Sequence, residues 1–315
     1  MTTSSLGRAT TLTVGAALDA AAARLATAGV ASPRLDAEVL LADALGLGRA
    51  ALIARRPEPL PGDALEAFEA RVARRAAREP VAYIIGRREF YGLEFEVTRD
   101  VLIPRPETEL LVEEALGNLP GVSLARAGAH APRAPEAEAA PSTPRVVDVG
   151  TGSGCIAVAI AVHAPAARVV AVDASDAALA VARRNAARHG VAGQIEFVRG
   201  DLLAGLDGPF DLVVANLPYV STEEIETLMP DVRLYEPALA LDGGAGDGLA
   251  LVRALVGQSV GRLASGGLLL LEVAAGQAAR VADLLWSVGA FSDVSIRRDL
   301  AGIERIVRGR AWTRS

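Results

Sequence analysis

The residues best suited to chemistry are four consecutive ones, Asn216-Leu217-Pro218-Tyr219, at the end of an apolar run typical of a buried strand. A planar amide or amino nitrogen is a poor nucleophile because its lone pair is delocalised. A site that alkylates it must hold both N–H bonds and aim the lone pair at the donor. The Asn216 side-chain oxygen and the Leu217 backbone carbonyl are two suitable acceptors. Pro218 stiffens the loop, and the Tyr219 ring offers a face for a planar group.

We therefore predict that Asn216, Pro218 and Tyr219 are catalytic, and that Asn216, Leu217, Pro218 and Tyr219 bind the substrate. Catalysis would consist mainly of positioning and of stabilising positive charge that develops on nitrogen. The competing interpretation is an ordinary proline-containing turn after a strand. Neither a Ser–His–Asp arrangement nor a metal cluster is required, and we expect no metal.

A second group of residues lies in the turn Asp148–Gly154, where glycines alternate as G-x-G-x-G. A dinucleotide fingerprint would need glycine where Cys155 stands. A Walker-type loop is excluded because the chain has no lysine. This pattern, with Asp148 before it, resembles motif I of class I S-adenosylmethionine methyltransferases. The resemblance implies a cofactor with an amino-acid tail and a sulfonium, which needs close backbone approach and an acceptor for its ammonium. The alternative is a plain strand-to-helix turn. The predicted cofactor-binding residues of this turn are Asp148, Gly150, Thr151, Gly152, Ser153 and Gly154.

Further candidate cofactor residues follow the next strands. Asp173 ends the second strand, 19 residues after Gly154, where a carboxylate can accept both ribose hydroxyls. Its competing role is a helix cap, although Ser175 and Asp176 are better placed for capping. After the third strand, Asp201 is a candidate for the adenine amino group and Leu202 for packing on the ring.

These residues need a scaffold in which strands and helices alternate, and the chain supplies one from Arg145 onward. Such alternation predicts an α/β fold with a doubly wound, mostly parallel sheet that binds ligands at the carboxyl ends of its strands. The predicted strands are Arg145–Val149, Arg168–Asp173, Ile195–Arg199, Asp211–Ala215, Leu268–Val273, Val294–Arg297 and Glu304–Arg308. The predicted helices are Cys155–Val162, Ala177–His189, Asp247–Arg262 and Ala278–Val288.

Three domains are predicted: a helical bundle at 1–80 that docks a partner, a β-hairpin linker at 81–105, and a catalytic domain at 106–315. Apolar residues recur at helical spacing in the first segment. The second is aromatic and β-branched with a break at Gly92, which favours a hairpin. Residues 117–144 are rich in Ala and Pro without periodicity and are predicted to be an insertion.

Composition limits the class of protein. The 315 residues carry a net charge of −6, which argues against a broad nucleic-acid surface. A local cluster of arginines has two interpretations, a contact for an acidic partner or RNA and a solvated helix face; it comprises Arg71, Arg74, Arg75, Arg78, Arg87 and Arg88. No apolar run reaches the roughly 20 residues of a membrane helix. The N-terminus is a poor secretory signal, and the single cysteine fits a reducing cytoplasm.

Several segments together resemble the bacterial release-factor glutamine N5-methyltransferases. The resemblance runs from the helical N-terminal segment to the last strand, without the insertion and the extreme ends. The tetrapeptide departs from the N-P-P-Y motif of glutamine and adenine N-methyltransferases because Leu217 replaces a proline; its N-L-P-Y form also resembles ribosomal-RNA adenine dimethyltransferases. The matching segments are Arg88–Gly92, Val101–Glu109, Asp148–Gly154, Asp231–Leu249 and Asp299–Arg305.

The resemblance implies a class I, Rossmann-like methyltransferase domain, S-adenosyl-L-methionine as cofactor, and class I peptide chain release factors as protein substrates. The methylated group would be the glutamine amide of their Gly-Gly-Gln loop. It also implies that Gly150–Gly154, Asp173, Leu202 and Asn216 bind the cofactor. We further expect a cytoplasmic monomer without direct nucleic-acid binding. The rival hypothesis is a nucleic-acid adenine N6-methyltransferase.

Four residues upstream have two interpretations each. Phe90 and Tyr91 are predicted to line the glutamine pocket, but a hairpin that packs on the core explains them as well. Glu107 and Thr108 either hold the methionine end of the cofactor or cap the helix that follows.

Overall fold

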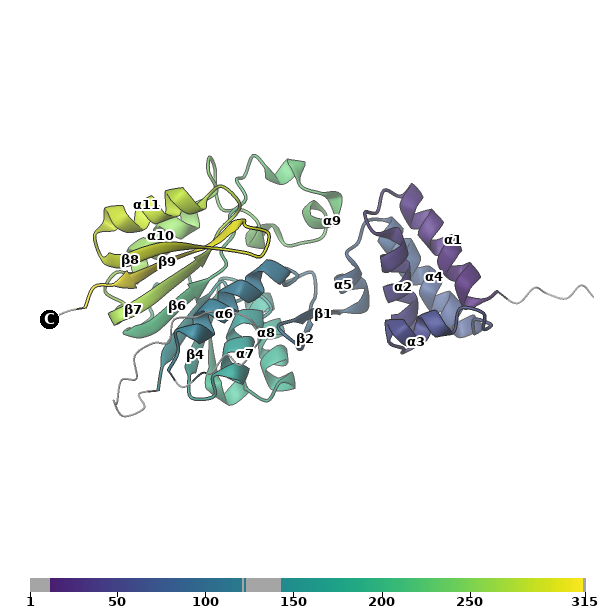
Figure 1. The fold of residues 1–315 in the computed structure, drawn as a ribbon, viewed down its shortest axis with the longest axis horizontal. Helices are drawn as coiled ribbons and strands as arrows, with labels where there is room; N and C mark the ends of the chain where they lie inside the picture. Colours follow the sequence, from purple (N-terminus) through teal and green to yellow (C-terminus); the bar gives the residue numbers. More distant parts are fainter. Residues whose placement is uncertain (1–11, 121, 123–142, 314–315) are drawn as a thin grey trace, which may run out of the picture. The chain divides into compact units, whose positions relative to one another are not determined.

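The computed structural model describes residues 12–120, 122 and 143–313 of the chain (Figure 1). It divides into two compact units. One runs to Gly86 and also contains the later segment Met229–Tyr235; the other contains Arg87–Leu228 and the chain from Glu236 onward. Most of the insertion predicted at 117–144 lies outside the described residues.

The first unit is built from helices that bury leucines and one phenylalanine. Leu18, Leu25, Leu40 and Phe68 are fully buried in one apolar cluster. Helix α1 begins after Thr13, whose side chain accepts from the Ala16 amide, and α2 begins with Pro33, whose missing N–H is not needed there. The helices are α1 (Val14–Thr27), α2 (Pro33–Ala44), α3 (Arg49–Ala54), α4 (Gly62–Ala76), α5 (Val81–Ile85) and α9 (Pro230–Arg233).

Most of the arginine cluster seen in the sequence is paired within this unit. Arg75 is buried and contacts Asp36 at 2.7 Å and Asp231 at 2.8 Å. Arg78 also binds Asp231, at 2.5 Å. Two others pair nearby, Arg71 with Asp43 and Arg74 with Glu79, each at 2.8 Å. These four arginines therefore do not form a free basic surface; they connect helices to one another and to the later segment.

A short hairpin opens the second unit. Strand β1 (Arg87–Phe90) pairs antiparallel with β2 (Leu93–Glu96), and the turn residues Tyr91 and Gly92 have φ of 54° and 75°. Positive φ at both positions is the geometry of a two-residue hairpin turn that matches strand twist. The hairpin lies within the linker predicted at 81–105, but it occupies only residues 87–96; α5 (Val81–Ile85) precedes it, and residues 97–103 follow without strand pairing.

The second unit is organised by a seven-stranded sheet in the order β5-β4-β3-β6-β7-β9-β8. The first five strands in this order are parallel and β9 is antiparallel to both neighbours. The α/β fold with a mostly parallel sheet is confirmed. Its strands are β3 (Arg145–Val149), β4 (Arg168–Asp173), β5 (Ile195–Arg199), β6 (Phe210–Ala215), β7 (Leu263–Glu272), β8 (Phe291–Arg298) and β9 (Glu304–Ala311).

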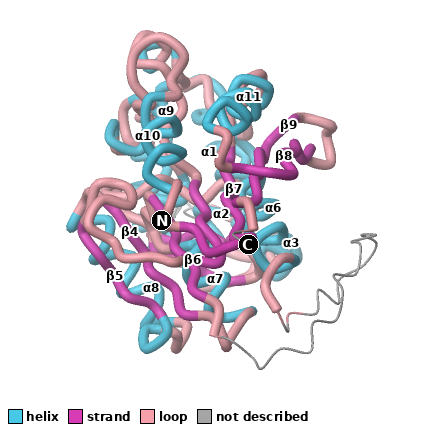
Figure 2. The backbone as a smooth tube through the Cα atoms, turned by 90° about the vertical axis from the view of Figure 1, so that its left-hand side faces the viewer, coloured by secondary structure: helices cyan, strands magenta, loops and turns pink. Residues whose placement is uncertain are grey.

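Helices cover both faces of this sheet (Figure 2). Val146 faces a cluster under α6 and α7, whereas its neighbour Val147 faces a cluster under α10 and α11, as strand alternation requires. Helices of this unit are α6 (Glu109–Gly117), α7 (Cys155–His163), α8 (Asp176–Arg188), α10 (Ala250–Ser259) and α11 (Ala278–Val288), with short 3-10 turns η1 (Pro106–Thr108), η2 (Ala192–Gln194), η3 (Ile225–Thr227) and η4 (Ala238–Ala240).

Several predicted boundaries differ from the structure; for example, β8 begins at Phe291 rather than at Val294 and β9 ends at Ala311 rather than at Arg308. Two further differences have a local cause. Helix α10 begins at Ala250 rather than at Asp247, because Gly248 adopts a φ of 68° that interrupts a helix. Strand β7 begins at Leu263 rather than at Leu268, because a register shift opposite Phe210 and Leu212 lets it pair with β6 over a longer stretch.

Asn185 of α8 connects three parts of the second unit and is fully buried. Its Oδ1 accepts from the Glu96 amide at 2.8 Å, and its Nδ2 donates to the carbonyls of Glu96 at 3.0 Å and Ser153 at 2.9 Å. One side chain thereby joins the hairpin to the turn that follows β3. No sequence pattern indicated this role.

We expect Asn185→Ala to lower the free energy of unfolding by about 2–4 kcal/mol, because it leaves buried backbone groups without partners. Asn118→Ala is the control, because the Asn118 side chain also donates to a backbone carbonyl, that of Glu114, but is exposed. Water can replace its hydrogen bond, so the free energy of unfolding should fall by less than about 1 kcal/mol. Denaturant titration measures both, and equal losses would contradict the role of Asn185.

Candidate active site

The candidate site lies where the strand order reverses. From β3 the chain proceeds outward to β4 and β5, then returns to place β6 on the other side of β3. Asp148 pairs with Val214 and Val149 with Ala215 in register, so the turn after β3 and the residues after β6 leave the sheet side by side. This is the position at which open α/β sheets bind ligands.

The turn after β3 is held tightly against its neighbour strand. The amides of Gly150 and Thr151 both donate to the Val172 carbonyl at 2.9 Å, and the Gly152 amide donates to Asp173 Oδ2 at 2.8 Å. Gly150, Gly152 and Gly154 all have positive φ, between 55° and 80°. The sequence DVGTGSG therefore forms the left-handed, glycine-dependent turn that close approach of a ligand to backbone demands.

Asp148 is completely buried beneath this turn. Its Oδ2 accepts from the Thr151 hydroxyl at 2.6 Å and from the Ala157 amide at 3.1 Å, while among the described residues Oδ1 has no donor. Burial raises the pKa of Asp148 to about 7, and these two hydrogen bonds act in the opposite direction. A buried acceptor without a donor fits a cationic ligand nearby.

The residues after β4 and β5 lie at the same edge of the sheet. Asp173 is partly exposed, and its Oδ1 accepts from the Ser175 amide at 2.9 Å. The cap of α8 is Ser175, whose Oγ accepts from the Ala178 amide, as the sequence favoured. Asp201 is exposed, and the buried Leu202 has a φ of 54°. A leucine in the left-handed region is strained, and such strain is concentrated at functional sites.

Asn216–Tyr219 follow β6 directly, beside the turn after β3. Leu217 is buried, and a Cβ on Gly150 would lie 3.2 Å from its Cδ2. Asn216 Nδ2 donates to the Thr108 hydroxyl at 3.0 Å, which leaves Oδ1 as its acceptor. Within residues 12–120, 122 and 143–313, no hydrogen bond is found to the Leu217 carbonyl. Burial raises the pKa of the Tyr219 hydroxyl, and the neighbouring Glu272 adds to this shift.

The glycine-rich loop that contains Gly243 and Gly248 packs against the backbone of the tetrapeptide. A Cβ on Gly243 would lie 2.7 Å from the Pro218 carbonyl oxygen, and one on Gly248 would lie 2.3 Å from that of Tyr219. Gln277 Nε2 donates to the Tyr219 carbonyl and to the Asp247 carbonyl, each at 3.0 Å. The backbone of the tetrapeptide is thus packed against backbone, with no room for a side chain between.

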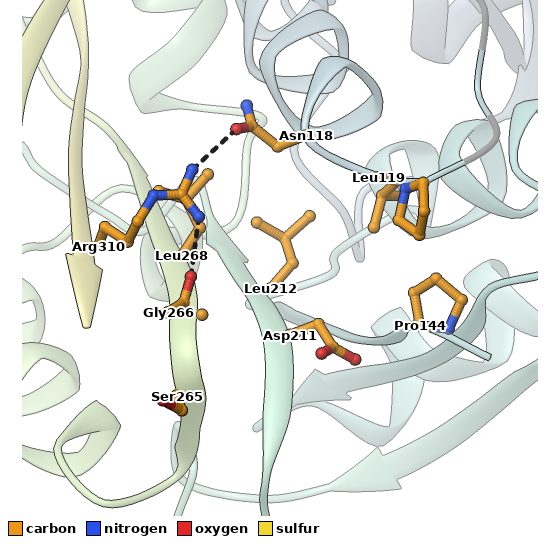
Figure 3. Close-up of a pocket in the computed structure, with 11 residues that line it drawn as sticks. Asn118, Leu119, Pro144, Asp211, Leu212, Ser265, Gly266, Leu268 and Arg310 are labelled. Carbon is orange, nitrogen blue, oxygen red and sulfur yellow. Dashed lines mark hydrogen bonds between the residues drawn. The ribbon is translucent and has the colours of Figure 1, made fainter. Parts of the chain in front are cut away.

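Two cavities differ in their relation to this site. One of about 500 Å³ is lined by Tyr219, Asp247, Gln277 and Arg280 among others, so it opens beside the tetrapeptide. The other, of about 170 Å³, lies at the opposite, amino-terminal end of β6 and β7, where Arg310 bonds Asn118 and the Gly266 carbonyl (Figure 3). Position at the strand ends assigns the first cavity to the site and separates the second from it.

The candidate residues that precede the glycine turn in the chain, Phe90, Glu107 and Thr108, have different surroundings in the structure. Phe90 is buried in the core under α6 and α7, in edge contact with Phe95 at 6.0 Å, which gives it a packing role. Thr108 precedes α6 but makes no side-chain cap; its hydroxyl binds Asn216 instead. Glu107 lies near enough to Glu272 and Tyr219 to raise the pKa of both.

Sequence analysis missed Glu272 and Gln277. Glu272 is the last residue of β7 and is almost fully buried, and its Oε2 has no donor among the described residues. The available signal was an acidic residue at the carboxyl end of the apolar run Leu268–Leu271, next to the strand that ends at Asn216. Within the described parts of the chain, no group of three or more His, Cys, Asp or Glu residues is placed to hold a metal ion.

The sheet order, the glycine turn and the Asn-Leu-Pro-Tyr segment together define a class I S-adenosylmethionine-dependent methyltransferase. Comparison with known proteins supports this class. The PrmC N-terminal domain family matches residues 16–86, and the methyltransferase small domain family matches residues 136–238. The solved hMettl16 catalytic domain, in complex with the MAT2A 3′UTR hairpin 6, covers 76% of this chain and 81% of its own at a TM-score of 0.52. At 16% identity, that likeness shows the fold alone.

Curated relatives make the assignment specific. The release factor glutamine methyltransferase of Geobacter sulfurreducens is 44% identical over 95% of this chain and 96% of its own length. The enzyme of Cereibacter sphaeroides is 44% identical over 93% of this chain and 97% of its own length. The enzyme of Burkholderia pseudomallei is 46% identical over 88% of this chain and 91% of its own length. The chain belongs to the release factor glutamine methyltransferase family.

We expect Gly248→Ala to lower kcat by roughly tenfold or more, because its Cβ would displace the Tyr219 carbonyl and misplace the tetrapeptide. Gly246→Ala is the matched control: it has a similar φ of 82° in the same loop but no atom within 4 Å of the added Cβ. Steady-state kinetics on both variants, with stability measured in parallel, tests this prediction. An equal loss of activity in the two variants would refute the role of Gly248 in placing the Tyr219 carbonyl.

We also expect the affinity for S-adenosylmethionine to fall by roughly tenfold as pH drops through about 7, because Asp148 then becomes neutral and no longer attracts a cation. Asp148→Asn keeps the shape of the side chain and should bind weakly at all pH values. Calorimetry between pH 6 and pH 8 tests this, and an equally steep pH dependence in the variant would refute it.

Proposed function

We propose that this protein transfers a methyl group from S-adenosyl-L-methionine to the side-chain amide nitrogen, N5, of the glutamine in the Gly-Gly-Gln loop of class I peptide chain release factors. The observation that carries the proposal is the Asn216–Leu217 pair of acceptors beside the glycine turn, in a chain that belongs to the release factor glutamine methyltransferase family. Family membership favours the amide over the adenine that the tetrapeptide alone left open, and no adenine activity is proposed.

The residues at the carboxyl edge of the sheet fit the cofactor. We assign the turn Gly150–Gly154 and Asp148 to its amino-acid end, Asp173 to the ribose hydroxyls, and Asp201 with Leu202 to the adenine. Donor-free oxygens on Asp148 and Glu272, both buried, are acceptors suited to a positively charged molecule. When bound, S-adenosylmethionine supplies an electrophilic methyl group on a sulfonium.

The chain's own residues make the glutamine amide reactive by holding it. Asn216 Oδ1 and the Leu217 carbonyl accept its two N–H bonds, which orients the nitrogen lone pair and stabilises the positive charge that grows there. Tyr219 stacks on the planar carboxamide. As the nitrogen bonds the methyl group, the bond from that methyl to the sulfonium sulfur would break and the sulfur would keep the electron pair. The nitrogen then loses one proton to solvent, so the product amide is neutral. Because Gly243, Gly248 and Gln277 fix the backbone of the tetrapeptide, little reorganisation is needed in this step.

The surroundings of the reaction are also part of the proposal. The described chain contains no helix long and apolar enough to cross a membrane. With one cysteine and a net charge of −6, we place the protein in the cytoplasm as a monomer that contacts a release factor and does not bind nucleic acid directly. The pairing of Arg71, Arg74, Arg75 and Arg78 with carboxylates supports the last point.

The decisive experiment incubates the protein with methyl-labelled S-adenosylmethionine and a class I release factor, next to the same factor with Gln→Ala in its Gly-Gly-Gln loop. Label should enter only the first factor. Label on both factors would refute the target, and label on RNA or DNA alone would refute the substrate class.

In the same assay, Asn216→Ala should lower kcat by roughly 10²-fold or more, with a modest loss of cofactor affinity, because an orienting acceptor is lost. The exposed Asn118→Ala serves as the control and should turn over normally. Near-normal turnover by Asn216→Ala would overturn the mechanism.

A further inference from the structure

Two leucines of the second unit are uncovered. Leu300 is 109% exposed and Leu239 is 62% exposed, the two highest values among the large hydrophobic side chains of residues 12–120, 122 and 143–313. Single apolar side chains on a surface are common and need no explanation by themselves. These two differ because each belongs to a short loop that is held by hydrogen bonds, and because both loops lie at the carboxyl edge of the sheet.

The loop between β8 and β9 presents Leu300 in a fixed position. Asp299 Oδ1 accepts from the amides of Ala301 and Ile303, each at 2.9 Å, and Asp299 Oδ2 accepts from Arg305 Nε at 3.0 Å. The Asp299 amide also donates to the Ile303 carbonyl at 2.8 Å. Because the loop is ordered without a partner, binding through Leu300 would not have to pay for ordering it.

This loop lies two strands away from the tetrapeptide. β6, β7 and β9 are neighbours in the sheet (Figure 1). Leu271 pairs with Ala215 at the end of β6, and the Val273 amide donates to the Arg305 carbonyl near the start of β9 at 2.9 Å. Because adjacent strands are about 4.8 Å apart, the loop begins about 10 Å from the end of β6.

Leu239 belongs to the turn η4, which is anchored at both ends. Before the turn, the buried Glu236 carboxylate accepts from Arg105 Nη2 at 2.6 Å. After the turn, the Leu241 carbonyl accepts at 3.1 Å from the amide of Val220, the residue that directly follows the tetrapeptide. Leu239 is thus held close in the chain to residues that contact the backbone next to the site.

The charged residues next to Leu300 are paired with one another. Arg305 binds Asp299 at 3.0 Å, and Arg298 binds Glu304 at 2.5 Å. Contacts with phosphates dominate the affinity for nucleic acids and need basic side chains that can reach them. The loop instead offers an uncovered apolar side chain beside charges that neutralise each other. Such a surface favours contact with apolar groups of a protein, because charged residues are depleted at the centres of protein interfaces.

The proposed substrate determines what would lie over these loops. The side-chain nitrogen of a glutamine is four bonds, or about 5 Å, from its Cα. A release factor whose glutamine reaches Asn216 and Leu217 must therefore bring its backbone to this edge of the sheet. An extended chain advances by at most about 3.5 Å per residue, so residues roughly three to four positions from the glutamine would reach the loop between β8 and β9.

We propose that Leu239 and Leu300 form an apolar docking surface for the release-factor segments on either side of the methylated glutamine. The inference rests on the proposed function for the identity of the partner. Neither leucine touches the reacting nitrogen in this arrangement. Both residues therefore act on specificity, and their loss should change KM for the release factor rather than kcat.

Substitution of each leucine tests this surface. Leu300→Ser and Leu239→Ser should each raise KM for a class I release factor by roughly tenfold, the loss expected when a leucine is no longer buried on binding. Leu300→Met keeps an apolar side chain and should retain the wild-type KM. Trp312→Ser is the control: Trp312 is 57% exposed but follows β9 at its other end, so KM should not change.

A binding measurement separates docking from chemistry. Its probe is a release factor with Gln→Ala in its Gly-Gly-Gln loop, titrated by calorimetry into the protein loaded with the demethylated cofactor. The Kd should rise in Leu239→Ser and Leu300→Ser by about the factor seen in KM. Because the contact is apolar, that factor should be similar at low and high salt. Asp299→Ala leaves Leu300 in place but loosens its loop, so it should raise Kd by a smaller factor.

A normal KM and Kd in a folded variant that carries both Leu239→Ser and Leu300→Ser would overturn the proposal. An increase that disappears at high salt would overturn it too, and so would an equal increase in Trp312→Ser. In each of these cases the wild-type protein still methylates the release factor and the proposed function stands. A wild-type protein that methylates no release factor would instead refute the proposed function, and with it the partner named for this surface.

Discussion

The site depends on a close approach between backbones. The turn after β3, the tetrapeptide after β6 and the loop that contains Gly243 and Gly248 pack so closely that a single added Cβ would lie 2.3 to 3.2 Å from atoms of the tetrapeptide. Close packing of this kind transmits displacement, because protein interiors have few voids to absorb it. In the proposed function, this packing lets the fold itself fix the two acceptors, Asn216 Oδ1 and the Leu217 carbonyl, that direct the lone pair of the substrate nitrogen.

Much of the scaffold was predictable because its strands are short apolar runs that end in polar or glycine residues. The bounds of β3, β4 and β5 agree with those predicted, and so does the α/β class. Boundaries failed where one residue overrode a periodic pattern: Gly248 delays α10, and the irregular pairing opposite Phe210 extends β7. Such deviations depend on tertiary contacts, which local spacing does not encode.

The candidate site divides in the same way. Residues in turns with a distinctive pattern, such as Gly150–Gly154 and Asn216–Tyr219, were found from sequence and lie side by side in the structure. Asn185 and Gln277 were not, because each acts through hydrogen bonds to residues far away in the chain. Glu272 was not found either, because its burial at the end of β7 depends on tertiary packing. For the arginine cluster, the sequence showed the like charges but not the carboxylates that pair with them. Its like charges are adjacent in sequence, but their carboxylate partners, Asp36, Asp43 and Asp231 among them, come from other elements.

The segment Met229–Tyr235 has a consequence for how the two units are joined. It leaves the methyltransferase unit, is bound in the helical unit through Asp231 to Arg75 and Arg78 and through the Tyr235 hydroxyl to the Ala77 carbonyl, and then returns. The polypeptide therefore crosses between the units three times, at Gly86, at Leu228 and at Tyr235. A shortened protein that starts at Arg87 would still contain the segment Met229–Tyr235 but would lack Arg75 and Arg78, to which Asp231 binds. The helical unit therefore cannot be removed by cutting the chain at a single peptide bond.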